Sequence, residues 1–404
     1  MYKESALNII EKVKDKARRH KERHCELGYQ YIFSDSIHFV NGQDWDSIAK
    51  NNTIFLSRDY LQTIEKYSPE NTSQRYAIAY SEGEPVLVIA CQLAEISGEQ
   101  LIKTDSSAGG GLKSNYRERV LVCGNLVSSG LHGVGFSDTL DEEVGWRIVA
   151  EVLYKIRRSE KLSGEVDFAL IKDVKGDQVE VSKVIERFSY RKIQTDPDMV
   201  LDLGEGISSF DDYLKLLNSK YRSRINKTIK RIDQSDFRCE KLVLNETVDK
   251  KIHELYLQVE KRSKTSLATL PQGYFLGLSQ SLSDNFACYG IVKGDEIAGF
   301  ITVIKDRDDA VAYYVGFDYD VNDKHPLYFR LLQLVIESAV SMQCKKVLFG
   351  RSALEPKANL GAKPIDSFVW ARHRVPVVNF FVRKLFRNVP FDEAPERGAL
   401  KKIV

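Results

Sequence analysis

The chain contains one strand–turn–strand pattern twice, about half its length apart. The first copy spans Tyr76–Ile89 and turns at Gly83, and the second spans Cys288–Ile301 and turns at Gly294. Each copy is followed by more strand-forming sequence, then an amphipathic helix pattern and a short apolar run. A unit repeated at this spacing limits the folds available to the chain. The sequence therefore predicts an α/β protein with a layered α+β arrangement, made of two tandem repeats.

Periodicity and charge divide the chain into five segments. A helical extension is expected at the N-terminus and a basic helical connector between the repeats, where Ser208 and Ser209 can cap a helix that starts with two aspartates. A basic, amphipathic tail is expected at the C-terminus. The bounds are 1–52 for the extension, 53–206 for the first repeat, 207–236 for the connector, 237–375 for the second repeat and 376–404 for the tail.

Composition excludes several classes of protein. The 404 residues carry a formal net charge of +2, which predicts no strong global attraction to nucleic acid, so no DNA partner is expected. The N-terminus has no apolar signal sequence, and no run of about 18 apolar residues could span a membrane. The six cysteines are scattered without metal-ligand spacing, so we expect no metal and a reducing, cytoplasmic location.

Three basic stretches have two interpretations each. The N-terminal stretch Lys12–His24 and the connector stretch Asn218–Asp233 are either solvated helix faces or contacts for an anionic partner. In the connector, one helix face would be apolar and the opposite face cationic, through Lys220, Arg224, Lys227 and Arg231. The tail, with aromatic residues among cations, either packs against a core or makes peripheral contact with the inner membrane.

Three stretches carry a resemblance to a known family. They are Phe210–Leu214 with Lys220–Lys227 in the connector, Ala312–Asp318 in the second repeat, and Phe349–Ser352 with Lys357–Ala362 near its end. In this order they are similar to the tandem-GNAT acyltransferases, the group that includes FemAB-like aminoacyl ligases and cellulose-biosynthesis-protein-like acetyltransferases. The resemblance covers about residues 53–375 and implies, for each repeat, a mixed, mostly antiparallel sheet flanked by helices.

The glycine loop that binds CoA pyrophosphate in GNAT proteins is not evident. In those proteins, backbone N–H groups at a helix start hold the phosphates. The second repeat has Val321–Pro326 at this position, without a glycine pair, although Lys324 could supply positive charge. The first repeat offers Gly130–Gly135, a partial match. Acyl-CoA as co-substrate is the expectation, and either repeat could hold it.

The strand Ala310–Gly316 supplies the expected catalytic residues. The resemblance implies that the backbone at Val315 and Gly316 polarises the donor carbonyl. Tyr313 or Tyr314 could protonate the leaving group, and strand alternation is expected to place one of them in the core and the other in the cleft. Asp318, the nearest carboxylate, could act as the base.

Cations are expected to hold the anionic parts of the substrates. The resemblance implies this role for Arg351 and Lys357, and Arg222 belongs to the connector motif. Ordinary surface positions remain the alternative for each. The histidines His132, His325 and His373 have no triad or metal-site spacing, so we interpret them as structural or surface residues.

The sequence therefore predicts a transferase that moves an acyl group, from acyl-CoA, onto an amine of a small molecule or cell-envelope precursor. The first alternative is an aminoacyl-tRNA-dependent ligase of the FemAB type, in which connector residues 215–231 would meet tRNA phosphates. No inserted coiled-coil pattern, common in those ligases, is evident. The second alternative is a non-catalytic binding module for an anionic metabolite.

Overall fold

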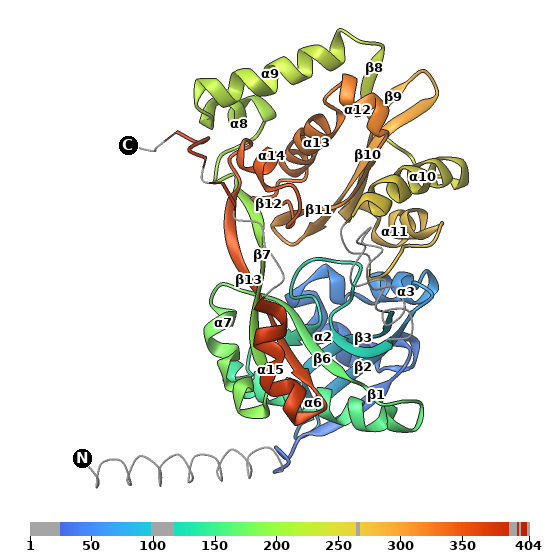
Figure 1. Cartoon of the computed structure of the whole chain (residues 1–404), viewed down its shortest axis with the longest axis vertical. Helices are drawn as coiled ribbons and strands as arrows, with labels where there is room; N and C mark the ends of the chain where they lie inside the picture. The colour runs from blue at the N-terminus through green and yellow to red at the C-terminus, as the bar shows by residue number, and fades with distance from the viewer. Residues whose placement is uncertain (1–24, 98–116, 264–266, 388–393, 396, 402–404) are drawn as a thin grey trace, which may run out of the picture.

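The computed structural model describes residues 25–97, 117–263, 267–387, 394–395 and 397–401. The expected N-terminal helix, up to residue 24, and the glycine-rich loop at 106–111 lie outside these residues. Within them, one continuous sheet runs through both repeats, with helices on both of its faces (Figure 1). No helix in this described part is long and apolar enough to cross a membrane.

The sheet contains thirteen strands among the described residues. They are β1 (Gln30–Ser34), β2 (Thr72–Ser81), β3 (Glu84–Ser97), β4 (Arg117–Cys123), β5 (Val134–Phe136), β6 (Phe168–Lys175), β7 (Arg191–Asp202), β8 (Phe237–Lys241), β9 (Phe286–Lys293), β10 (Glu296–Asp306), β11 (Asp309–Phe317), β12 (Lys346–Leu348) and β13 (Lys363–His373). Their order is β1-β2-β3-β4-β6-β13-β7-β12-β11-β10-β9-β8, with β5 beside β3. Only β4–β6 and β11–β12 are parallel, so the mixed, mostly antiparallel sheet is confirmed.

The helices complete each repeat. They are α2 (Gly42–Asn52), α3 (Arg58–Lys66), α6 (Glu142–Ser159), α7 (Gln178–Val181), α8 (Phe210–Leu216), α9 (Ser219–Asp233), α10 (Glu246–Arg262), α11 (Tyr274–Leu282), α12 (Tyr319–Lys324), α13 (Leu327–Ser341), α14 (Leu354–Ala358) and α15 (Pro376–Arg387). Ser209 caps α8 as expected, since its hydroxyl accepts from the N–H of Asp212. The α9 helix buries Ile225 and Ile232 and leaves its cationic face exposed.

The two hairpins have the expected two-residue turns. Ser81 pairs with Glu84 in the first hairpin, and Lys293 pairs with Glu296 in the second. Glu82 and Gly83 both have positive φ, the requirement of a type I′ turn, whereas the second turn needs positive φ only at Gly294. The duplicated pattern therefore folds into a β-hairpin twice, with a different turn conformation in each copy.

The first repeat begins earlier than the sequence indicates. Residues 30–34 form β1 rather than part of a helical extension, and β1 pairs with β2 as β8 pairs with β9. The α2 helix, at residues 42–52, buries Trp45 in the core that both repeats share. The β1 strand is short and mostly exposed, so its sequence lacks the alternation that marks a half-buried strand.

The repeats exchange their last strands. The β13 strand of the second repeat lies between β6 and β7, both from the first repeat. In turn, β7 pairs with β12 of the second repeat, with Leu201 opposite Val347. One hydrophobic cluster also joins α2 and α3 of the first repeat to α10 and α11 of the second, including Tyr60, Tyr274 and Phe300. Each repeat therefore depends on the other for its sheet and its core.

Candidate active site

A cavity lies where β11 and β12 separate. The two strands pair only over Asp309–Val311 and Lys346–Leu348, whereas β11 continues to Phe317. The cavity has a volume of about 260 Å³, and a loop of the first repeat, residues 126–129, forms part of its wall. Its lining residues are Leu126, Val127, Ser128, Ser129, Asp198, Val311, Ala312, Tyr313, Tyr314, Leu348 and Gly350. Both repeats thus contribute to one cavity.

A β-bulge places the two tyrosines beside this cavity. Ile301 pairs with Val315 and Val303 with Ala312, so two residues of β11 lie opposite the single residue Thr302. The Thr302 hydroxyl accepts from the N–H of Tyr314 at 2.9 Å, which fixes the bulge. The bulge breaks the alternation, so the expectation of one tyrosine in the core and one in the cleft is wrong. Both rings pack on the shared core, and both line the cavity.

The tyrosine hydroxyls are bonded within the protein. The Tyr313 hydroxyl lies 2.5 Å from that of Tyr274 and 3.0 Å from that of Tyr60, so three phenols form one chain. The Tyr314 hydroxyl donates to the carbonyl of Val127 at 3.0 Å. Burial raises the pKa of Tyr313 and Tyr314 well above the ordinary value, so both phenols are neutral at physiological pH. No sequence pattern indicated Tyr60 or Tyr274, because they lie on helices far from β11 in the chain.

Asp198 is the carboxylate that faces the cavity. It lies on β7, is 2% exposed, and forms an ion pair through Oδ2 with Lys175 of β6. Its other oxygen, Oδ1, is buried and has no hydrogen-bond partner in the described structure. The hydroxyl of Ser129, also in the cavity wall, is likewise buried without a partner. Buried polar atoms normally have partners, so these two atoms point to a ligand. No motif in the sequence indicated Asp198.

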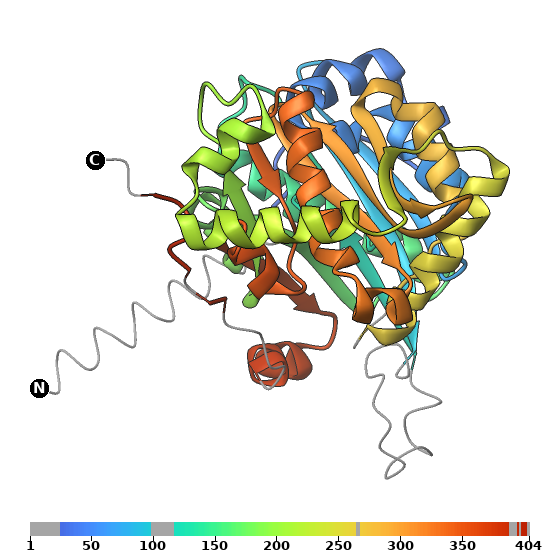
Figure 2. The same cartoon turned by 90° about the horizontal axis from the view of Figure 1, so that it is seen from above.

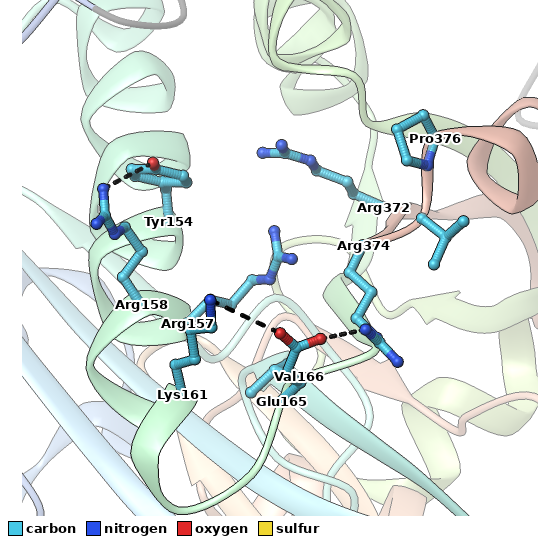
Figure 3. Close-up of a pocket in the computed structure, with 10 residues that line it drawn as sticks. Tyr154, Arg157, Arg158, Lys161, Glu165, Val166, Arg372, Arg374 and Pro376 are labelled. Carbon is cyan, nitrogen blue, oxygen red and sulfur yellow. Dashed lines mark hydrogen bonds and ion pairs between the residues drawn. The ribbon is translucent and has the colours of Figure 1, made fainter.

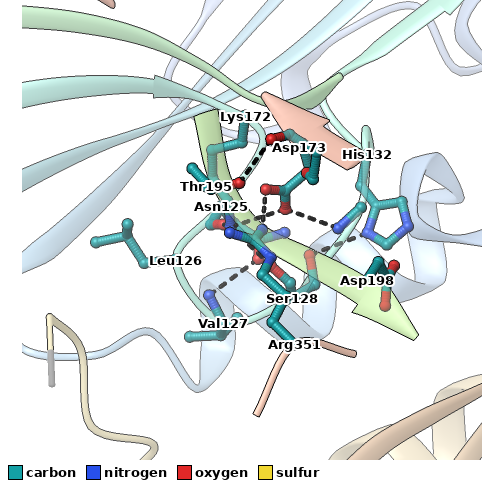
Figure 4. A network of polar contacts seen from close by, with 12 residues as sticks. Asn125, Leu126, Val127, Ser128, His132, Lys172, Asp173, Thr195, Asp198 and Arg351 are labelled. Atoms are coloured by element: carbon teal, nitrogen blue, oxygen red, sulfur yellow. Dashed lines mark hydrogen bonds and ion pairs between the residues drawn. The ribbon is translucent and has the colours of Figure 1, made fainter. Parts of the chain in front are cut away.

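A second buried carboxylate, Asp173, joins the repeats (Figure 4). It is fully buried, forms an ion pair with Arg351, and accepts from the N–H of Gly130 at 2.8 Å. Beside it, the Lys172 ammonium donates to the carbonyls of Asn125 and Ser128 at 2.6 and 2.7 Å. Burial, with repulsion from Arg351, lowers the pKa of Lys172 to about 7. These contacts hold the loop that closes the cavity.

The expected cations Arg351 and Lys357 belong to this cluster. Lys357 is 2% exposed and donates to the carbonyl of Gly350 at 3.2 Å, and burial lowers its pKa to about 8. Burial lowers the pKa of Arg351 to about 10, and its Nε is buried without a partner. With Lys172 and Lys175, four cations face two carboxylates, Asp173 and Asp198. The excess of positive charge favours an anionic ligand.

Comparison with known proteins identifies the region that supplies β11 and β12. A family model described as an acetyltransferase (GNAT) domain matches residues 219–358. This stretch, about a third of the chain, is therefore similar to a GNAT domain. No curated protein matches the chain significantly in sequence.

Two solved structures share the fold of both repeats together. FemX superposes with a TM-score of 0.56 at 10% identity, over 88% of this chain and 100% of that chain. The C-terminal domain (DUF2156) of a putative lysylphosphatidylglycerol synthetase from Agrobacterium fabrum gives a TM-score of 0.50 at 10% identity, over 86% and 96%. At this identity the likeness shows a common fold. The expected resemblance to the tandem-GNAT group is confirmed.

The GNAT phosphate-binding position is already occupied by internal contacts. At the start of α13, the N–H of Leu327 donates to the carbonyl of His325 at 2.7 Å, and that of Tyr328 donates to Asn322 Oδ1 at 2.9 Å. In the partial match of the first repeat, the N–H of Gly130 donates to the carboxylate of Asp173. These three N–H groups are therefore not free to bind a CoA pyrophosphate.

Four expected site residues have other positions. Asp318 caps α12, where its Oδ1 accepts from the N–H groups of Asp320 and Val321 at 2.9 and 3.1 Å. Val315, next to the bulge, packs against the core on the α13 side of the sheet. Lys324 is exposed at the end of α12, and Arg222 lines a broad groove along α9. None of the four lines the cavity between β11 and β12.

Gly316 allows a helix, not a ligand, to approach. A Cβ at this position would lie 2.6 Å from the backbone N of Tyr256 and 2.5 Å from a ring atom of Phe300. The α10 backbone therefore packs directly on this residue of β11. A helix rather than a ligand therefore takes up the space beside Gly316, and the bulge of β11 lies at Tyr313 and Tyr314.

The histidines make structural contacts. His132 stacks on Phe55 with ring centroids 3.7 Å apart, and burial lowers its pKa well below the ordinary value, so the ring is neutral. His373 lies near Glu118 and Asp167, and their ligand-capable atoms are within 4.8 Å of one another. Asp167 is bonded to the N–H of Arg119 and to Arg374, which already neutralises it.

Proposed function

We propose that the protein is an N-acyltransferase whose acceptor amine binds at Asp198. The observation that carries the proposal is the unpartnered Oδ1 of Asp198, buried in the cavity at the point where β11 and β12 of the GNAT domain separate. An ammonium group is the natural donor for a buried carboxylate oxygen. Asp198 then takes the proton that the amine must lose before it can attack, as a general base in hydrogen-bond reach.

The remaining residues have separate roles in this reaction. The amine nitrogen attacks the donor carbonyl, a C–N bond forms, and the C–S or C–O bond to the leaving group breaks. Tyr313 is a better proton donor to the leaving group than Tyr314, because Tyr60 or Tyr274 can replace the proton of Tyr313 along the chain of phenols. Arg351 and Lys357 stabilise an anionic group of the acceptor, a carboxylate or a phosphate.

Acyl-CoA is the first donor to test, because acetyltransferases give the domain its family description. The reaction releases CoA thiol, which a thiol reagent detects. We expect turnover with one class of acyl-CoA and a loss of about 100-fold or more in Asp198→Asn. Asp202→Asn, an exposed aspartate at the end of the same strand, is the matched control and should retain activity. Equal activity in both variants would refute the role of Asp198.

Aminoacyl-tRNA is the second candidate donor, and one observation favours it. The N–H groups of Leu327, Tyr328 and Gly130 are already bonded within the protein, so they are not free for CoA phosphates. The exposed cations of α9 provide an alternative contact for phosphates. Transfer of a labelled amino acid from charged tRNA, lost in Asp198→Asn, would support this donor. Ligand binding without turnover with either donor would instead support a binding module.

A further inference from the structure

A cationic pocket lies between α6 of the first repeat and the end of β13, apart from the cavity described above. The end of α6 and the end of β13 form it, with a volume of about 360 Å³. Five cations and one carboxylate, Glu165, are among its lining residues, and the cations are Arg157, Arg158, Lys161, Arg372 and Arg374. Glu165 forms an ion pair with Arg374 and lies 4.0 Å from Lys161, so its charge is already used (Figure 3).

Two guanidinium groups of this pocket have no counterion. Arg157 and Arg372 make no side-chain hydrogen bond or ion pair within the described residues, and Nε of Arg157 is buried without a partner. Figure 3 shows both groups pointing into the same space. Burial lowers the pKa of Arg157, and repulsion from the charge of Arg372 lowers it further. An anion between them would remove this repulsion and satisfy the buried donor.

The helix that starts at the pocket rim exposes apolar side chains. Val375 and Pro376 line the pocket, and Pro376 is the first residue of α15. Asn379 and the fully buried Val382 attach α15 to the protein, and the Asn379 amide donates to the carbonyl of Ser189 at 2.9 Å. Its outer side exposes Val377, Phe380 and Phe381, which are 68%, 73% and 46% accessible. The exposed cations Lys384 and Arg383 follow, and Arg383 forms an ion pair with Glu186 at 2.9 Å.

We propose that this surface binds an anionic phospholipid bilayer. A lipid phosphate would lie between Arg157 and Arg372, and Phe380 and Phe381 would enter the region of the headgroups. Exposed aromatic residues beside cations, on one outer helix, match the chemistry of such an interface. Figure 2 shows α15 at the edge of the molecule, where a flat surface can reach it. The two aromatic rings distinguish this ligand from a free phosphate, which would need only the arginines.

The test is co-sedimentation of the full chain with vesicles of phosphatidylcholine alone or mixed with phosphatidylglycerol. We expect binding only to the mixed vesicles, weakened by salt. Arg157→Gln and Arg372→Gln should each reduce it about fivefold. Phe380→Ser combined with Phe381→Ser should also reduce vesicle binding, because both exposed rings are lost. The buried anchors Asn379 and Val382 stay in place, so α15 should remain attached to the protein.

Matched controls exclude a general effect of charge or hydrophobicity. Lys227→Gln with Lys230→Gln removes two exposed cations of α9, and Phe39→Ser removes an 80% exposed phenylalanine outside α15. Both should bind vesicles like the unchanged chain. Equal loss in the controls, or equal binding to neutral vesicles, would overturn the proposal. Binding of inorganic phosphate that needs Arg157 and Arg372, without vesicle binding, would replace it with a site for a free phosphate.

Discussion

Arg351 of the second repeat forms an ion pair with Asp173 of the first, and this pair joins the two halves of the active-site cluster. Asp173 is fully buried, so loss of Arg351 leaves a buried negative charge without its ion-pair partner. Arg351→Ala should therefore lower the free energy of unfolding by about 3 kcal/mol, measured by urea denaturation. Arg351→Ala with Asp173→Asn should recover part of this loss. If the double variant is no more stable than the single one, the pair does not have this role.

Stability should depend on pH through Lys357. Its pKa is about 8 in the folded chain and close to 10.5 in the unfolded chain. Between these values the unfolded chain binds more protons, so the free energy of unfolding rises with pH. We expect a rise of about 1–3 kcal/mol from pH 8 to 10.5 that is smaller in Lys357→Met. Denaturation at several pH values measures it. The same slope in both proteins would argue against a buried, charged Lys357.

Binding of an anionic acceptor should weaken as the pH rises from 7 to 9. Lys172 and Lys357, with pKa values of about 7 and 8, lose their positive charge as the pH rises through this range. The apparent affinity for the acceptor should therefore fall from pH 7 to pH 9, visible as a rising KM. Lys357→Arg keeps the charge and should flatten the profile, because arginine stays protonated. A flat profile in the unchanged chain would contradict a role for these lysines in binding.

The two tyrosines of the bulge should respond differently to loss of the hydroxyl. Tyr313→Phe interrupts the chain of phenols and should lower kcat about 100-fold with little change in KM. Tyr314→Phe removes a donor to the carbonyl of Val127 and should cost about 1 kcal/mol of stability, with kcat nearly unchanged. Steady-state kinetics and urea denaturation of both variants separate the roles. Equal kcat values would remove Tyr313 from the proposed mechanism.

Local sequence patterns predict the elements of this fold well and their long-range pairing poorly. The duplicated hairpins, the cap at Ser209 and the two faces of α9 follow from turn chemistry and periodicity, which act over a few residues. The position of β13 between β6 and β7 depends on contacts far apart in the chain, and no local pattern encodes it. The bulge at Tyr313 is of the same kind, since Thr302 on another strand fixes it.

The site could be predicted only in part for the same reason. Arg351 and Lys357 follow from the motif at the end of the GNAT domain, and both belong to the buried cluster. Asp198 and Asp173 lie in the first repeat, where the motif gives no guidance, and the strand exchange brings Asp198 to the second repeat. Asp318 illustrates the opposite error, because nearness in sequence to β11 suggested a base where the structure has a helix cap.

The strand exchange leads to a last prediction about the two repeats. If each repeat were an independent domain, residues 25–206 would fold alone. However, β7 would then lack both of its neighbours, β12 and β13, and β6 would have an exposed edge. Such unpaired edges favour aggregation. We therefore expect the isolated segment to aggregate or to lack a cooperative unfolding transition. Co-expression with residues 207–404 should restore a soluble complex, because the missing strands are then supplied. A cooperative transition in residues 25–206 alone would show that the exchanged strands are not required for folding.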